Sequence, residues 1–203
     1  MGAQRQQAPK RSMGSPERRG WSRSCWTEGT VSETRLILTC GLPGAGKTTL
    51  ARQLAADRGA VRLTKDEWLT ALGSSPWDEP TREKVERELW RLAREILRLG
   101  MSVVLDFGLW ARTERDELRS AARGLGVGVE LHFLDVPADE LWRRVHARNS
   151  APPWDSHPIR RADLDGWLRT FQAPDADELA LFDPAPRLET EPLRVGQPPA
   201  RGR

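Results

Sequence analysis

An eight-residue loop motif, Gly41-Leu42-Pro43-Gly44-Ala45-Gly46-Lys47-Thr48, constrains this 203-residue chain more than any other feature. It fits the pattern G-x-x-x-x-G-K-[ST] of phosphate-binding loops. Glycines let the backbone curve closely around an anion and turn its N–H groups inward. Because a glycine-rich turn can match this pattern by chance, the flanking residues decide between the two interpretations.

Both flanks of the motif have the form that a phosphate-binding loop requires. Residues 36–40 are a short apolar run that predicts a buried parallel strand. Residues 49–56 carry leucines four positions apart, which predicts an amphipathic helix whose amino terminus adds partial positive charge at the loop. We therefore predict a site for ATP and Mg²⁺, in which Lys47 reaches the β- and γ-phosphates and the Thr48 hydroxyl is a Mg²⁺ ligand. The predicted nucleotide-binding residues are Gly41, Leu42, Pro43, Gly44, Ala45, Gly46, Lys47, Thr48 and Thr49.

Short apolar segments alternate with helical periodicity along the rest of the chain. Further strands are predicted over residues 60–64, 102–106 and 127–134, and helices over 67–72, 81–99, 113–123, 138–149 and 161–171, with a last turn over 177–182. Gly100 is placed to end the helix over 81–99, and Thr113 to Asp116 approximates a capping box. Strands that alternate with helices imply right-handed βαβ units. We predict an α/β fold of three layers, a P-loop NTPase whose parallel sheet is flanked by helices.

Two aspartates follow predicted strands, at the edge of the sheet where open α/β folds bind ligands. Asp66 follows the second strand. If that strand neighbours the loop, the Asp66 carboxylate can accept the proton of an attacking hydroxyl. The alternative is that Asp66 is the N-cap of the short helix over residues 67–72. Asp106 ends the strand Val103-Val104-Leu105, as expected of a carboxylate that holds Mg²⁺ directly or through water. The alternative there is a turn with Gly108.

The helix over residues 138–149 places Arg144 and Arg148 four residues apart on one side. It leads into a proline-rich segment, so we predict a lid near residues 149–162 that brings at least one guanidinium group over the phosphates. The alternative is a solvated basic face paired with the acidic residues at the start of the helix. Arg143 is expected to point outward, and Arg160 and Arg161 fall within the same predicted lid.

The positive charge of the chain is concentrated at its two ends. Residues 1–30 carry six basic and two acidic side chains, and residues 184–203 carry four and two. Because the whole chain has a net charge of +3, the intervening residues have −3. A nucleic-acid-binding body shows the opposite distribution. By composition we predict a disordered extension at residues 1–33, a P-loop domain at 34–183 and a flexible tail at 184–203.

Cysteine, histidine and hydropathy exclude several other classes of protein. Cys25 and Cys40 give no disulfide framework, and Cys40 is expected to be a small buried hydrophobe. The three histidines share no metal-ligand spacing. No apolar run approaches the ~18 residues of a transmembrane helix, and no apolar region follows the basic amino terminus. We therefore expect a cytoplasmic protein that does not bind a membrane.

The loop, Asp66, Asp106 and the segment Leu141–Asn149 resemble, in this order and spacing, the small P-loop kinases. The branch in question contains predicted bacterial AAA-type ATP-binding proteins, chloramphenicol phosphotransferase, zeta toxins and the polynucleotide kinase domain. The resemblance covers about residues 34–172. It implies a nucleoside-kinase-like sheet and an ATP·Mg²⁺ donor. The catalytic residues that it implies are Lys47, Asp66 as general base, and Arg144 or Arg148 at the transferring phosphoryl group.

One departure from the resemblance bears on the acceptor. Polynucleotide kinases of this branch resemble one another in an Asp-x-x-Arg whose arginine grips the nucleic-acid phosphate, whereas Leu69 stands three residues beyond Asp66 here. Together with the acidic body, this favours an enzyme that phosphorylates a hydroxyl of a small molecule, in a pocket built from Trp68, Trp77, Trp110 and the lid. Two alternatives remain. The first is a polynucleotide 5′-hydroxyl kinase that binds through its basic ends, and the second is a nucleotide-binding switch that hydrolyses ATP slowly.

Overall fold

The structure is a computed structural model, and it describes residues 34–75, 78–150 and 158–185. All of these residues belong to the same structural unit. The predicted disordered extension lies outside the described residues, as does nearly all of the predicted tail. Trp77 and residues 151–157 of the predicted lid also lie outside them.

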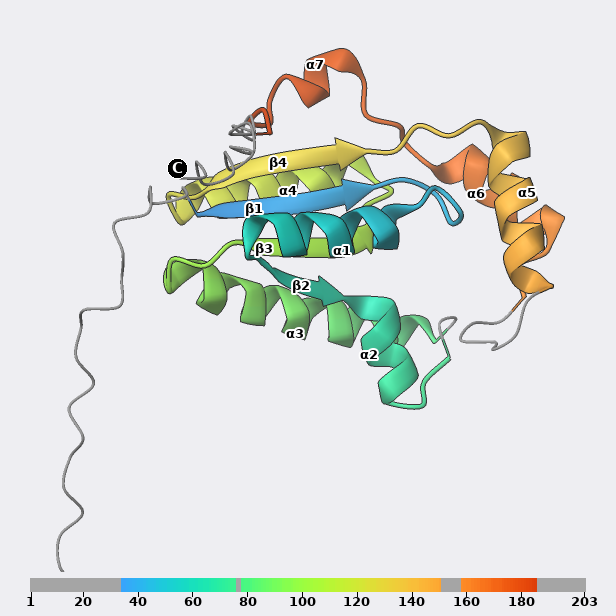
Figure 1. Ribbon diagram of the computed structural model, residues 1–203, viewed down its shortest axis with the longest axis horizontal. Helices are drawn as coiled ribbons and strands as arrows, with labels where there is room; N and C mark the ends of the chain where they lie inside the picture. The colour runs from blue at the N-terminus through green and yellow to red at the C-terminus, as the bar shows by residue number, and fades with distance from the viewer. Residues whose placement is uncertain (1–33, 76–77, 151–157, 186–203) are drawn as a thin grey trace, which may run out of the picture. The chain divides into compact units, whose positions relative to one another are not determined.

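Four parallel strands form the sheet in the order β2-β3-β1-β4 (Figure 1). Their bounds are β1 Arg35–Cys40, β2 Val61–Thr64, β3 Val103–Gly108 and β4 Gly128–Phe133. β1 lies at the centre, where Leu36 is opposite both Val103 of β3 and Val129 of β4. The predicted parallel sheet is confirmed, and within the described residues β2 pairs only with β3.

Helices cover both faces of the sheet (Figure 1). α1 (Lys47–Arg58) packs on one face, where Ala51 and Leu54 contact Ile37 and Val104. α3 (Glu79–Arg98) and α4 (Arg112–Gly124) cover the other face over a larger core that includes Leu36. Since both faces are buried, the central strands are nearly continuous apolar runs, as in other parallel sheets. The predicted three-layer arrangement is confirmed.

α3 begins two residues earlier than its sequence predicts. The Asp78 side chain caps it by accepting hydrogen bonds from the Thr81 backbone N–H and hydroxyl at 3.4 and 2.6 Å. Pro80 lies in the first turn, where its missing N–H costs nothing. At the other end Gly100, with φ of 80°, donates its N–H to Leu97 O, so the predicted stop at this glycine is confirmed.

Two other helix starts differ from the predictions. α2 (Lys65–Ala71) follows β2 directly with Thr64 in the N-cap position, so the interpretation of Asp66 as an N-cap is wrong. α4 begins at Arg112, one residue before the predicted capping box. There Glu114 Oε2 accepts the Ala111 N–H at 2.9 Å. A carboxylate three residues into a helix can satisfy this donor without a hydroxyl at the N-cap, which is why the pattern pointed to the wrong start.

After β4 the described residues form three more helices: α5 (Ala138–Asn149), α6 (Arg161–Thr170) and α7 (Ala176–Leu179). Leu141 of α5 and Leu164 of α6 form a small core with Leu42 and Ala45 of the phosphate-binding loop. Asn149 joins the ends of the segment between α5 and α6, because its side chain donates to Ile159 O at 2.7 Å and accepts from Ile159 N at 3.3 Å. In the described parts of the chain, no helix has the length and apolar character needed to cross a bilayer.

Candidate active site

The loop between β1 and α1 is held by its neighbours on both sides. Gly41 N–H donates to Gly108 O of β3 at 3.1 Å, and α1 starts at Lys47, so its amino terminus opens into the loop. Gly44 has φ of 87°, and a Cβ there would lie 3.0 Å from Val145 Cγ2 and 3.1 Å from Leu141 O. Glycine is therefore required at position 44 by the close approach of α5 to the loop.

Lys47 belongs to the loop motif and is the first residue of α1, and its side chain folds back onto the loop. Its ammonium donates to Leu42 O at 2.9 Å. Burial lowers the pKa of Lys47, while the charges of Asp106 and Asp66 oppose that shift. The charges of Asp66 and Asp106 thus act on the Lys47 ammonium at this edge of the sheet.

Asp106 lies within β3 rather than at its end, since the strand continues to Gly108. The alternative of a strand-terminal turn with Gly108 is therefore wrong. Leu38 is opposite Leu105 and Cys40 is opposite Gly108, so β3 places two residues, Asp106 and Phe107, against Thr39. Such a bulge redirects side chains, and here the carboxylate Oδ1 accepts the Thr39 hydroxyl at 3.2 Å.

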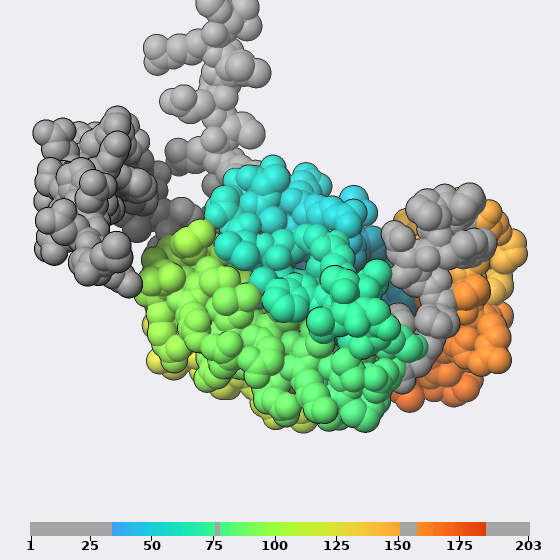
Figure 2. Space-filling view, turned by 90° about the horizontal axis from the view of Figure 1, so that it is seen from below, coloured from blue at the N-terminus to red at the C-terminus, as the bar shows by residue number. Residues whose placement is uncertain are grey.

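Asp66 is exposed in the first turn of α2. Within the described residues its carboxylate makes no hydrogen bond or ion pair, although its charge opposes the lowering of the Lys47 pKa. β2 does not neighbour β1, so Asp66 approaches the loop from beyond β3. On the face shown in Figure 2, α2 (teal) lies between α1 (cyan) and α3 (green). An unpaired carboxylate in this position is available to an incoming hydroxyl group.

Arg144 of α5 reaches the phosphate-binding loop. Its Nη1 lies 3.4 Å from both Gly44 O and Ala45 O, and its Nε donates to Glu140 Oε1 at 2.6 Å. Arg143 is three-quarters exposed and pairs with the same glutamate. These two arginines lower the pKa of Glu140 to about 2, through hydrogen bonds first of all. The predicted proximity of Arg144 to the loop and the alternative of local acidic pairing are thus both seen in one side chain.

The other predicted lid arginines lie farther from the loop contacts. Arg148 is exposed and has no partner among the described residues. Arg160 pairs with Asp163 within α6. Arg161 pairs with Asp165, and its guanidinium lies 5.7 Å from the ring centroid of Trp142. Only Arg144 is in contact with the loop in this conformation.

The predicted aromatic pocket is only partly assembled. Trp110 packs at a ring-centroid distance of 5.6 Å from Trp167, in the core between the loop, α5 and α6. Its role is therefore packing, the commoner one for such a residue. Trp68 is 45% exposed on α2 and has no part in that core. Trp77 lies outside the described residues.

The residues present are suited to Mg²⁺, which prefers oxygen ligands. Asp106 Oδ2 is buried and accepts no hydrogen bond from any described residue, while the Thr48 hydroxyl is exposed at the start of α1. In the described residues no three His, Cys, Asp or Glu side chains gather into a protein-only metal cluster. One carboxylate and one hydroxyl are what a site needs when nucleotide phosphates supply the other ligands.

Sequence reasoning missed a buried ion pair behind the site. Arg115 is fully buried, and its Nε and Nη2 donate to the two carboxylate oxygens of Glu178 at 2.6 and 2.9 Å. Its Nη1 donates to Leu109 O at 2.9 Å and Trp110 O at 3.3 Å. The Cys40 thiol donates to the same Leu109 carbonyl, and burial raises its pKa to about 11, so it stays protonated. This group fixes the turn after β3, in which Leu109 has φ of 47°.

A second arginine near the site was also missed. Arg62 of β2 lies 3.7 Å from Asp106 Oδ2, measured from Nη1, without a hydrogen bond between them. Its Nη2 donates to both carboxylate oxygens of Glu67, at 2.6 and 2.7 Å. An arginine inside an otherwise apolar strand was the available sequence signal, because a buried guanidinium requires a partner.

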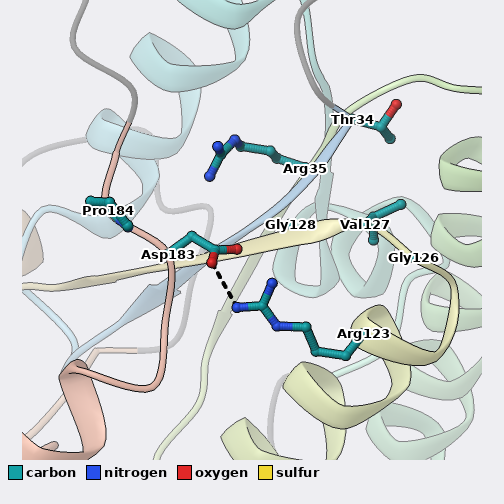
Figure 3. Close-up of a pocket in the computed structure, with 8 residues that line it drawn as sticks. All are labelled: Thr34, Arg35, Arg123, Gly126, Val127, Gly128, Asp183 and Pro184. Carbon is teal, nitrogen blue, oxygen red and sulfur yellow. Dashed lines mark hydrogen bonds and ion pairs between the residues drawn. The ribbon is translucent and has the colours of Figure 1, made fainter.

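A cavity of about 600 Å³ opens at the other end of the sheet, beside the starts of β1 and β4 (Figure 3). Asp183 lines it, and its Oδ1 accepts a hydrogen bond from Arg123 at 2.7 Å while its Oδ2 accepts the Val129 N–H at 2.6 Å. The carboxylate is thus fully engaged with its own chain, and none of the predicted site residues lines the cavity.

The chain matches the family described as an AAA domain over residues 36–174. It belongs to this AAA domain family. No curated protein sequence matches the chain. The AAA domain spans the loop, both aspartates and α5, and it ends before α7, so Glu178 lies beyond the matched residues.

Solved structures show the same P-loop kinase-like fold. A protein of the Pnkp1/Rnl/Hen1 RNA repair complex superposes with a TM-score of 0.57 at 17% identity, covering 68% of this chain and 44% of that chain. Kti12 from Chaetomium thermophilum, solved with ADP-AlF3, gives 0.54 at 22% identity, with 69% and 81% covered. A sugar kinase from Janibacter sp. HTCC2649 gives 0.51 at 25% identity, with 71% and 82% covered. The chain spans less than half the length of the RNA repair proteins that it matches, 44% and 41%.

Proposed function

We propose that this protein is an ATP-dependent kinase that transfers the γ-phosphoryl group of ATP to a hydroxyl of a small molecule. The observation that carries the proposal is the placement of Lys47, Asp106 and Asp66 toward the carboxyl ends of β1, β3 and β2, where the charges of both aspartates act on the lysine. Lys47 is suited to a donor phosphate, Asp106 to a metal ion and Asp66 to an acceptor. A nucleotide-binding protein without an acceptor has no need of the third group.

Each residue has a defined part in this reaction. The loop N–H groups and Lys47 bind the phosphates, and Thr48 and Asp106 hold Mg²⁺, which neutralises charge on the phosphate oxygens when it is bound. Asp66 accepts the proton of the acceptor hydroxyl while the hydroxyl oxygen forms a bond to the γ-phosphorus. The bond between that phosphorus and the ADP oxygen breaks. Arg144 would leave the carbonyls of Gly44 and Ala45 and donate to the transferring phosphoryl oxygens.

The environment of Leu69 supports a small acceptor over a polynucleotide. Polynucleotide kinases that this chain resembles have an arginine at the corresponding position, whereas Leu69 is fully buried in the main core. An arginine there would point into apolar side chains rather than toward a nucleic-acid phosphate. Two of the matched structures are of RNA repair complexes, so a 5′-hydroxyl oligonucleotide is a necessary arm of the test.

The test is transfer of radiolabelled γ-phosphate from ATP to antibiotics, sugars, nucleosides and 5′-hydroxyl oligonucleotides. Asp66→Asn should leave ATP affinity within about twofold of wild type and lower transfer by 10² or more, since a positioned base contributes roughly that factor. Lys47→Ala should lower both the affinity for ATP and the rate of transfer. Asp177→Asn, at an exposed aspartate of α7, is the matched control and should change neither.

Each other outcome has a definite meaning. Wild-type transfer by Asp66→Asn contradicts the assignment of the base. Labelling of the oligonucleotide alone favours the 5′-kinase, and hydrolysis of ATP without transfer to any acceptor favours the nucleotide-binding switch.

A further inference from the structure

Arg62 occupies a costly position for a charged residue. It lies in β2 opposite Val104, its side chain is only 16% exposed, and it is on the face of the sheet that carries Asp106. Removing a guanidinium group from water is unfavourable unless its donors find acceptors. The contacts that offset this cost show what the residue does.

Glu67, and not Asp106, holds the guanidinium group of Arg62. One nitrogen, Nη2, donates to both oxygens of the Glu67 carboxylate. This contact is the main cause of the lowered pKa of Glu67. Arg52 of α1 also donates to Glu67 Oε1, at 3.0 Å, but its side chain is 64% exposed. Glu67 therefore restrains Arg62 at one edge and leaves its other terminal nitrogen directed at the site.

The remaining nitrogen faces Asp106 without bonding to it. Arg62 Nη1 and Asp106 Oδ2 are 3.7 Å apart, and both atoms are buried with no hydrogen-bond partner among the described residues. Two oppositely charged groups at such a short distance normally form a hydrogen bond, because each buried group without a partner costs free energy. Here the restraint from Glu67 keeps Oδ2 open.

We propose that Arg62 is the counter-ion of Asp106 and controls how tightly the site binds Mg²⁺. Held by Glu67, its charge repels a cation beside Asp106 while leaving Oδ2 free to accept that cation or its water. The metal then binds well only together with the negative charge of nucleotide phosphates. This inference rests on the metal role of Asp106 in the proposed function, and it makes Arg62 a positioning residue that touches neither nucleotide nor acceptor.

The experiment measures the Mg²⁺ concentration at which a fluorescent ADP analogue binds half-maximally, with no acceptor present. Arg62→Met removes the repelling charge and should lower this midpoint about tenfold, as expected for a weakly screened charge a few ångströms away. Glu67→Gln weakens the restraint, so Arg62 can close on Asp106 and the midpoint should rise severalfold. Arg52→Gln also removes a partner of Glu67, but at an exposed position, and should leave the midpoint within about twofold.

Opposite shifts in the Arg62 and Glu67 variants support the counter-ion role. A purely structural role would loosen the site in both variants, so shifts in the same direction, or no shift in either, overturn it. A wild-type protein whose ADP binding does not depend on Mg²⁺ overturns it as well. If Arg62→Met does not fold, Arg62→Gln, which removes the same charge but keeps a polar side chain, takes its place in the comparison with Glu67→Gln. Failure of phosphoryl transfer leaves this result intact, because no transfer step is measured.

Discussion

Two buried arginine–carboxylate pairs lie near the carboxyl end of this sheet, on opposite faces, and only one of them is hydrogen-bonded. Arg115 and Glu178, on the α4 side, have side chains 0% and 2% exposed and share two hydrogen bonds. Arg62 and Asp106, on the α1 side, are 16% and 3% exposed and share none. The arginine and the carboxylate are thus hydrogen-bonded to each other in the first pair and not in the second.

The difference separates a structural contact from a functional one. Arg115 has satisfied its donors with Glu178 and with the carbonyls of the turn after β3, so it has nothing to offer a ligand. The turn that it fixes directly follows Gly108, whose carbonyl accepts the Gly41 N–H of the phosphate-binding loop. Asp106 Oδ2 is the one carboxylate oxygen among the buried side-chain atoms of the described residues that have no hydrogen-bond partner, and its charge acts on Lys47.

Removing the charge of Glu178 should break the completed pair with the largest effect on stability. Glu178→Gln leaves the buried guanidinium of Arg115 uncompensated, which costs about 3–5 kcal/mol and lowers Tm by roughly 10 °C. Urea and thermal unfolding measure this change. Arg112→Gln, on the same helix as Arg115, removes exposed pairs with Asp175 and Asp116 and should cost under about 1 kcal/mol. A Glu178 variant as stable as that control would show that the pair is not a structural brace.

Removing the charge of Asp106 should cost much less. In Asp106→Asn the Thr39 hydroxyl keeps an acceptor, and Arg62 keeps both hydrogen bonds to Glu67, so no buried charge loses its hydrogen-bond partners. We expect a stability within about 1 kcal/mol of wild type, together with loss of the Mg²⁺ dependence of ADP binding. Denaturant unfolding and the ADP titration measure the two effects. A loss of 3–5 kcal/mol would make the two pairs equivalent and remove the contrast between them.

The features that were predicted correctly from sequence are local. The phosphate-binding loop, its strand and its helix lie within 25 consecutive residues or so, and each has a pattern of its own. The parallel sheet followed from the alternation of strands and helices, and Cys40 is fully buried as expected. The placement of Asp66 and Asp106 toward the carboxyl ends of β2 and β3 followed from the strand pattern, although the order of the strands did not.

The features that were missed depend on partners distant in sequence or on local irregularity. Arg115 and Glu178 are 63 residues apart, and the second of them lies beyond the AAA domain match. The bulge that directs Asp106 toward Thr39 arises from strand register, which a single strand does not encode. The start of α4 was misplaced because a glutamate alone completes its amino terminus.

The last prediction, with the smallest expected effect, tests whether Arg62 is bonded to Glu67 rather than to Asp106. The pKa of Glu67 is lowered, first by its hydrogen bonds from Arg62 and less by Arg52. A carboxylate with a depressed pKa stabilises the fold above its unfolded pKa of about 4.3, and this contribution is lost as pH falls through the folded value. Arg62→Gln should therefore raise the Glu67 pKa toward its ordinary range and flatten the acid side of the stability profile. Arg52→Gln should raise it less. NMR titration of the Glu67 carboxyl carbon measures both, and an unchanged pKa in Arg62→Gln would mean that Arg62 is not held by Glu67 in solution.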